Sequence, residues 1–83
     1  MQMIHPGEQV VSMVPDGESI EVYTVVKVLP DGVQVDGASG KLSKAALRVF
    51  SEGAVNRIRE KERLLKGIKQ EIRHLYDTLD RVA

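Results

Sequence analysis

Two histidines are the side chains of this chain that best suit proton transfer or metal binding near neutral pH. His5 precedes Pro6 near the N-terminus, and His74 lies close to Asp77 and Asp80 in the last part of the chain. Neither histidine has neighbours at the spacing of a metal site, and we interpret the two aspartates as groups that cap a helix end. The sequence contains no cysteine, and it offers no set of nucleophile, base and orienting group. We therefore expect no enzyme activity, no metal site and no cofactor.

The loop at residues 37–41 superficially resembles a phosphate-binding loop. Its sequence, Gly-Ala-Ser-Gly-Lys, does not have the spacing G-x-x-x-x-G-K-[ST], and no helix is predicted directly after it. Residues 1–10 contain no long apolar run, and no stretch approaches the roughly 20 apolar residues that span a bilayer. Together with the absence of cysteine, these features favour a cytoplasmic protein without membrane contact.

The twelve basic and twelve acidic residues of the chain are unevenly distributed. Residues 1–40 hold six acidic residues and one basic residue, which is a net charge of −5. Residues 41–83 hold eleven basic and six acidic residues, which is a net charge of +5. Such a division is typical of a charged binding surface or of two halves that attract each other within one molecule or oligomer, and we favour the second interpretation.

A basic stripe is spaced by seven residues over Arg59, Lys66 and Arg73, with Arg63 beside it. On one helix these side chains share a face that could contact nucleic-acid phosphates. Pairs such as Glu62 with Lys66 also fit a solvated helix face. A competing prediction places a protein partner on acidic side chains of the first half of the chain. These candidate contacts are Glu18, Glu21 and Asp31.

Residues 54–82 carry the strongest structural signal, a heptad pattern of apolar residues. We predict one long helix over residues 51–83, with Ser51 as its N-cap. Such a helix extends about 45 Å, which is more than a small sheet can cover, so a second copy of the chain is the expected partner. A hairpin that breaks at Gly67, and cover by a different protein, are the alternatives. The predicted oligomer interface consists of Ile58, Leu65, Ile68, Ile72, Leu75, Leu79 and Val82.

Residues 1–50 contain five predicted strands, at residues 8–14, 20–29, 33–36, 41–42 and 47–50, with a helical turn at 43–46 and a frayed lead-in at 1–6. The long strand at 20–29 is expected to bend, and its even-numbered residues, from Ile20 to Val28, are expected to share one apolar face. Pro-Asp-Gly turns precede and follow this strand, so we expect positive φ angles at Gly17 and Gly32. A third, glycine-rich turn is predicted at residues 36–40.

This order of elements resembles the SH3-like small barrel of the KOW and Tudor type over residues 5–50. The resemblance rests on the opening at residues 6–10, Pro-Gly-Glu-Gln-Val, on residues 25–35 around the second turn, and on the close at residues 43–49. It implies a non-enzymatic binding module for protein, RNA or DNA. The chain departs from barrels that read methyl-lysine or proline-rich peptides, because Tyr23, Phe50 and Tyr76 are too few to form an aromatic cage or groove.

These patterns predict an α+β protein with a small five-stranded SH3-like antiparallel barrel at residues 1–50 and one long, coiled-coil-like amphipathic helix at residues 51–83. We expect a non-enzymatic homo-oligomer that binds a larger protein, in the manner of a small regulator or a phage-type inhibitor. One alternative is a dimeric regulator that binds nucleic acid through the basic helix face. The other is a structural subunit of a larger assembly.

Overall fold

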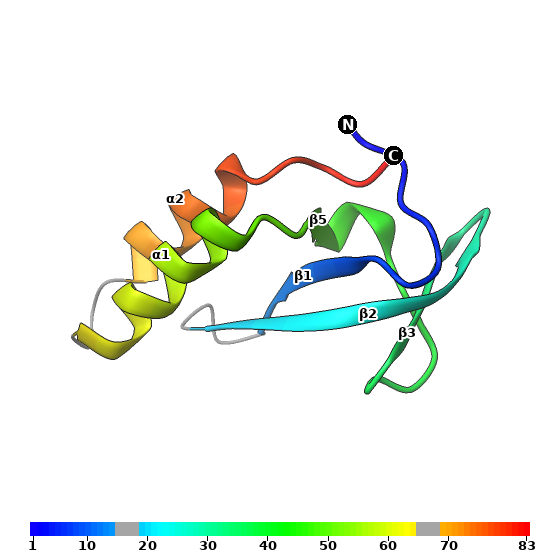
Figure 1. Ribbon diagram of the computed structural model, residues 1–83, viewed down its shortest axis with the longest axis horizontal. Helices are drawn as coiled ribbons and strands as arrows, with labels where there is room; N and C mark the ends of the chain where they lie inside the picture. Colours follow the sequence, from blue (N-terminus) through cyan, green and yellow to red (C-terminus); the bar gives the residue numbers. More distant parts are fainter. Residues whose placement is uncertain (15–18, 65–68) are drawn as a thin grey trace.

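The computed structural model describes residues 1–14, 19–64 and 69–83, apart from the side chain of residue 64. In this part of the chain, five strands precede two helices (Figure 1). The strands are β1 (Gln9–Met13), β2 (Ile20–Leu29), β3 (Gly32–Asp36), β4 (Lys41–Leu42) and β5 (Leu47–Val49). A 3-10 turn, η1 (Lys44–Ala46), precedes β5, and the helices are α1 (Glu52–Leu64) and α2 (Lys69–Thr78). Neither of these helices has the length and apolar character needed to cross a membrane.

The five strands form one antiparallel sheet in the order β4-β3-β2-β1-β5. The first half of β2 pairs with β1, and the second half pairs with β3. β-branched residues favour the extended backbone of this ten-residue strand. The prediction of an α+β protein with five antiparallel strands is therefore confirmed, and so is the helical turn before the last strand.

A β-bulge interrupts β2 between Val25 and Lys27, so that Val26 has no partner residue on β3. An extra residue on one strand reverses the side on which all later residues point. Ile20 therefore packs toward the helices, whereas Val28 packs into the cluster on the opposite face. The expected continuous apolar face from Ile20 to Val28 is wrong for this reason.

Side chains alternate along β1 between two hydrophobic clusters. Val10 lies in the first cluster, with Val25 and Leu47, and we call this side of the sheet its inner face. Val11 lies in the second cluster, on the outer face, with Ile20 and apolar residues of both helices. Burial of a side chain of this size contributes about 1.5–3 kcal/mol to stability. Both clusters combine residues before position 51 with residues after it.

The helical part of the chain differs from the single long helix predicted over residues 51–83. α1 and α2 lie side by side and run in opposite directions, which one straight helix does not permit (Figure 1). α2 ends at Thr78, and the following residues include Leu79 and Val82, which are buried in the second and the first cluster. The physical reason is that the chain's own sheet offers the apolar stripe a partner without the entropic cost of association. Gly67 and the predicted break there lie outside the described residues.

The glycine of the second predicted turn is required for a different reason from the one expected. Gly32 does not have a positive φ, whereas Gly37 and Gly40 in the third turn do, at 98° and 75°. A Cβ at Gly32 would lie 2.9 Å from the backbone oxygen of Leu42 on β4. Glycine therefore allows β3 and β4 to approach closely at this point. Gly17 and its turn lie outside the described residues.

The first and last residues of the described chain pair with each other close to β5 (Figure 1). The Gln2 N–H donates to the Arg81 carbonyl at 2.8 Å, and the Val49 N–H donates to the Asp80 carbonyl at 2.8 Å. Ile4 is buried in the first cluster. The prediction of a frayed lead-in at residues 1–6 is therefore wrong, because apolar burial and backbone hydrogen bonds hold this segment on the sheet.

Candidate functional site

The helices cover only part of the outer face of the sheet. Val11 on β1 and Val22 in the first half of β2 pack into or against the second cluster, beneath α1 and α2. No described residue of β3 or β4 takes part in this cluster. We call the uncovered outer side of the second half of β2, β3 and β4 the open face. Its exposed residues are Thr24, Val26, Lys27, Gln34, Asp36 and Lys41.

The register of the strands arranges the polar residues of the open face in rows. Thr24 lies opposite Asp36, and a second row crosses three strands from Lys27 through Gln34 to Lys41. Directly opposed side chains on a sheet have Cβ atoms about 4.5–5.5 Å apart, so each row forms a continuous polar strip. The open face therefore presents two lysines, one aspartate and the side-chain amide of Gln34, all held in place by the hydrogen-bonded sheet.

Val26 is the apolar centre of the open face. Its side chain is 56% exposed, although valine in a strand is usually packed against a neighbouring layer. Val26 follows the inward-facing Val25, and the bulge adds Lys27 as a second consecutive residue on the outer side. Val26 therefore provides an apolar contact point between the two polar rows.

The acidic residues predicted to contact a protein partner lie in different places. Asp31 accepts a hydrogen bond from Lys41 at the edge of the open face, and this bond and the lysine charge hold the pKa of Asp31 below its usual range. Glu21 is exposed on β2, opposite Ser12 of β1 and away from the open face. Glu18 lies outside the described residues. The structure thus brings one of these acidic residues to the open face.

The structure separates the predicted basic stripe. Arg59 donates hydrogen bonds to the Ile20 carbonyl at 3.0 Å and to the Glu62 carboxylate at 3.1 Å, which ties it to β2. Arg63 is exposed on α1, and Arg73 is exposed on α2. Lys66 lies outside the described residues. A spacing of seven aligns side chains only along one continuous helix, and these arginines lie on two antiparallel ones.

Most described members of the predicted oligomer interface are buried within the single chain. Ile58, Ile72, Leu79 and Val82 are each no more than 6% exposed. Leu75 is partly buried, and Leu65 and Ile68 lie outside the described residues. A second copy of the chain was expected because the predicted long helix left these apolar residues with nothing to pack against. For the four buried residues, other parts of the same chain provide that packing.

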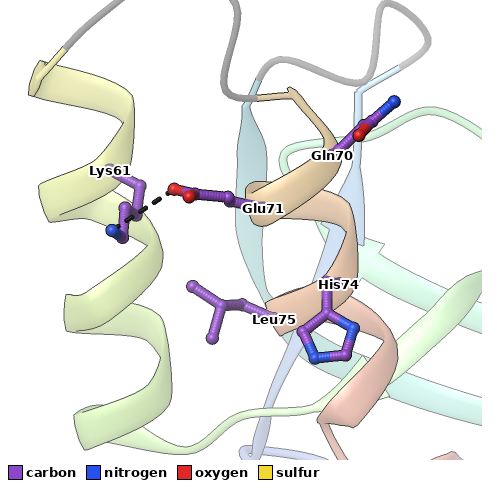
Figure 2. A pocket seen from close by; sticks show the side chains of 5 residues that line it. All are labelled: Lys61, Gln70, Glu71, His74 and Leu75. Atoms are coloured by element: carbon purple, nitrogen blue, oxygen red, sulfur yellow. Dashed lines mark ion pairs between the residues drawn. The ribbon is translucent and has the colours of Figure 1, made fainter.

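A pocket of about 310 Å³ lies between the two helices (Figure 2). Lys61 of α1 and Glu71 of α2 form an ion pair across it at 3.3 Å, and Leu75 lies in the space between the helices. The charge of Lys61 is thus accommodated by the neighbouring helix. His74 also lines this pocket. Because the two opposite charges satisfy each other, we assign no ligand to it.

Arg48 was not predicted as a site residue, yet it is a charged residue that is only 5% exposed. Its guanidinium lies over the Tyr76 ring, 4.7 Å from the ring centroid, and donates to the backbone carbonyls of Ala45 and Leu47. Burial raises the pKa of Tyr76, whose hydroxyl donates to the Ala46 carbonyl. The sequence does contain a signal for this position, because Arg48 lies between two apolar residues of a short strand. Side chains alternate along a strand, so Arg48 points away from the cluster that its neighbours enter and toward the layer on the other face.

The other residues that suit chemistry are dispersed. His5 Nδ1 lies 2.9 Å from a Glu8 carboxylate oxygen, and Asp80 lies 3.4 Å from the amino group of Met1. Within residues 1–14, 19–64 and 69–83, no three histidine, aspartate or glutamate side chains gather closely enough to hold a metal ion. Comparisons of the chain with protein-family models, with curated proteins and with solved structures find no match.

Proposed function

We propose that the protein is a non-enzymatic binding module whose open face contacts a larger protein. The observation that carries this proposal is the exposure of Val26 at a bulge, between two polar rows and away from the helices. Specific protein interfaces combine an apolar centre with a polar rim that fixes orientation. The open face has this arrangement on a part of the sheet that no helix covers.

We further propose that the sheet is a small barrel of the SH3-like type. The strand order, the bulge in the long second strand and the 3-10 turn before the last strand support this assignment. The helical hairpin is then an addition on the side of β1. This addition leaves the strands on the other side of the sheet for a partner.

The charges of the open face indicate the chemistry of the partner. Lys41 is paired with Asp31, whereas neither Lys27 nor Asp36 forms an ion pair with another described residue. The partner surface is therefore expected to offer an apolar side chain to Val26 and charges of both signs around it. Nucleic acid is a weaker candidate, because the net charge of residues 1–40 is −5 and Arg59 is engaged by the sheet.

Site-specific photocrosslinking in the native host tests this proposal. A photoreactive residue at Gln34 of the open face is expected to yield a discrete adduct with one protein. The same residue at Arg57, exposed on α1, is the matched control and is expected to yield none. Val26→Asp should abolish the adduct at Gln34 because it buries a charge at the apolar centre of the interface.

The fold of each variant is checked by circular dichroism, so that a loss of the adduct is not confused with unfolding. Nuclease treatment before irradiation should leave the adduct unchanged. Equal adducts from both positions, or an adduct that survives Val26→Asp in a folded protein, would contradict the proposed role of the open face.

A further inference from the structure

A second recess lies between the end of β1, the η1 turn and α2. Its cavity volume is about 300 Å³. It lies on a different side of α2 from the pocket in Figure 2, because Arg73, Tyr76 and Asp77 occupy a different helix face from Glu71, His74 and Leu75. We call it the Arg48 cleft. The lining residues that matter to its chemistry are Met13, Ala45, Arg48, Arg73, Tyr76 and Asp77.

The positive charge of Arg48 is incompletely paired within the chain. Its side chain is 6% exposed, and Asp77 Oδ1 lies 3.5 Å from Nη2. Nη1 donates to two backbone carbonyls, at 3.2 Å and 3.0 Å, while the buried Nε finds no hydrogen-bond partner in the described protein. A buried cation is costly unless ion pairs and hydrogen bonds satisfy it. The long contact between Nη2 and Asp77 is therefore one that a better-placed oxyanion in the cleft could replace.

The charged groups that line the cleft favour a negative ligand. Arg48 and Arg73 contribute two positive charges, and Asp77 contributes one negative charge. The Asp77 side chain is 54% exposed, so it can leave the guanidinium without being stranded in the interior. Tyr76 is neutral, since its hydroxyl proton is donated to the Ala46 carbonyl. An anion that replaces the Asp77 carboxylate beside Arg48 would also lie near the positive charge of Arg73.

We propose that the Arg48 cleft binds a carboxylate that is attached to a small apolar group. The carboxylate takes the position of the Asp77 carboxylate beside Arg48, and the apolar group lies against Met13 and Ala45. Nη2 can donate to such a carboxylate, and a hydrogen bond between two charged groups is stronger than one between neutral groups. This site is separate from the open face and does not depend on the function proposed there.

Two sources carry this chemistry: a free aliphatic acid and the C-terminus of a peptide chain. The test is an NMR titration of the nitrogen-15-labelled full chain with hexanoate and with an acetylated tripeptide that ends in leucine. Hexanamide and the amidated tripeptide are the neutral controls. Saturable shifts at the Arg48 side chain and at the Ala45 and Arg73 amides are expected with the acids only. A Kd in the millimolar range is expected because such ligands make few contacts. The acid with the lower Kd identifies which of the two sources the cleft recognises.

Variants separate a binding site from a purely structural role of Arg48. Arg73→Gln should weaken binding about fivefold, since a charge-assisted contact is lost. Asp77→Asn should tighten binding about threefold, because the competing carboxylate is removed. Arg63→Gln, exposed on α1 and outside the cleft, should leave the Kd unchanged. None of these substitutions removes the packing of Arg48 on Tyr76, so the folded protein is tested in each case.

A structural role alone predicts no saturable shift with any probe, and that result would overturn the proposal. Equal shifts from an acid and its amide would also overturn it, as would an Asp77→Asn variant that binds more weakly than the unmodified chain.

Discussion

The two halves of β2 show how one strand serves a covered and an open part of the molecule. In the first half, Ile20 and Val22 face the helices, and Tyr23 on the opposite side packs against the first cluster. In the second half, only the inner side is buried, and Val26 and Lys27 are exposed on the outer side. The change occurs where the strand exchanges β1 for β3 as its partner. The outer side of β2 is thus buried where the helices form a second layer, and beyond that point it is exposed and available to another molecule.

The largest expected effect comes from a charge placed in the covered half, at Ile72. This residue is 2% exposed in the second cluster, and an unpaired buried charge costs about 3–5 kcal/mol. Because small domains have stabilities of about 5–15 kcal/mol, Ile72→Arg should unfold most of the chain or shift its urea transition strongly. His74→Arg, on the exposed side of the same helix, should change stability by less than about 0.5 kcal/mol.

The same variant distinguishes burial within one chain from burial between copies. Light scattering could give a multiple of 9.2 kDa for the unmodified protein and a folded monomer for Ile72→Arg. That result would show that Ile72 is buried between two copies of the chain and not within one.

A smaller effect is expected in the open half, at Gly32. A Cβ at this position would lie 2.9 Å from the Leu42 backbone oxygen, and relief of such overlap costs about 1–3 kcal/mol. Gly32→Ala should therefore lower the urea midpoint. Gly53→Ala, in α1 with no atom within 4 Å of the added Cβ, should raise stability by about 0.5–1 kcal/mol. Equal stability of Gly32→Ala and the unmodified protein would show that β4 can move away from β3 without cost.

The smallest effect concerns Tyr76, beneath Arg48 in the covered half. Tyr76→Phe removes the hydrogen bond to the Ala46 carbonyl and should cost about 1 kcal/mol near neutral pH. Burial raises the pKa of Tyr76, so the unfolded chain loses this proton first as the pH rises. The stability of the unmodified protein should therefore fall above about pH 10, the ordinary pKa of tyrosine.

Urea unfolding at about pH 8 and about pH 11 measures this fall. The fall should be smaller in Tyr76→Phe and should persist in Tyr23→Phe, which leaves Tyr76 in place. An alkaline decline that is the same in all three proteins would show that Tyr76 does not ionise more readily in the unfolded chain.

The candidate site was only partly predictable, and the bulge in β2 is the reason. Alternation placed Val26 on the outer side and Lys27 on the inner side, whereas the extra residue brings Lys27 to the outer side, into a polar row of the open face. Whether a strand bulges depends on the register of its partner, here the match of Lys27 with Gln34, and the sequence of one strand does not contain that information. Asp31 was recognisable as an exposed turn residue, but its pairing with Lys41 depends on the position of β4.

The sequence by itself determined what is local. Strand and turn propensities follow from β-branched residues and from glycines such as Gly37 and Gly40, and they placed the five strands and the 3-10 turn. The heptad pattern likewise determined that one side of the helical segment is buried.

Only the tertiary structure decided what buries that side, since an apolar stripe gains the same free energy against its own sheet as against a second copy. The chain's own sheet is always present at a high effective concentration, so Ile58 and Ile72 pack within one molecule. The same packing of α2 against β5 placed Tyr76 and Asp77 beside Arg48. These residues are about thirty positions apart in the sequence, and no local pattern connects them.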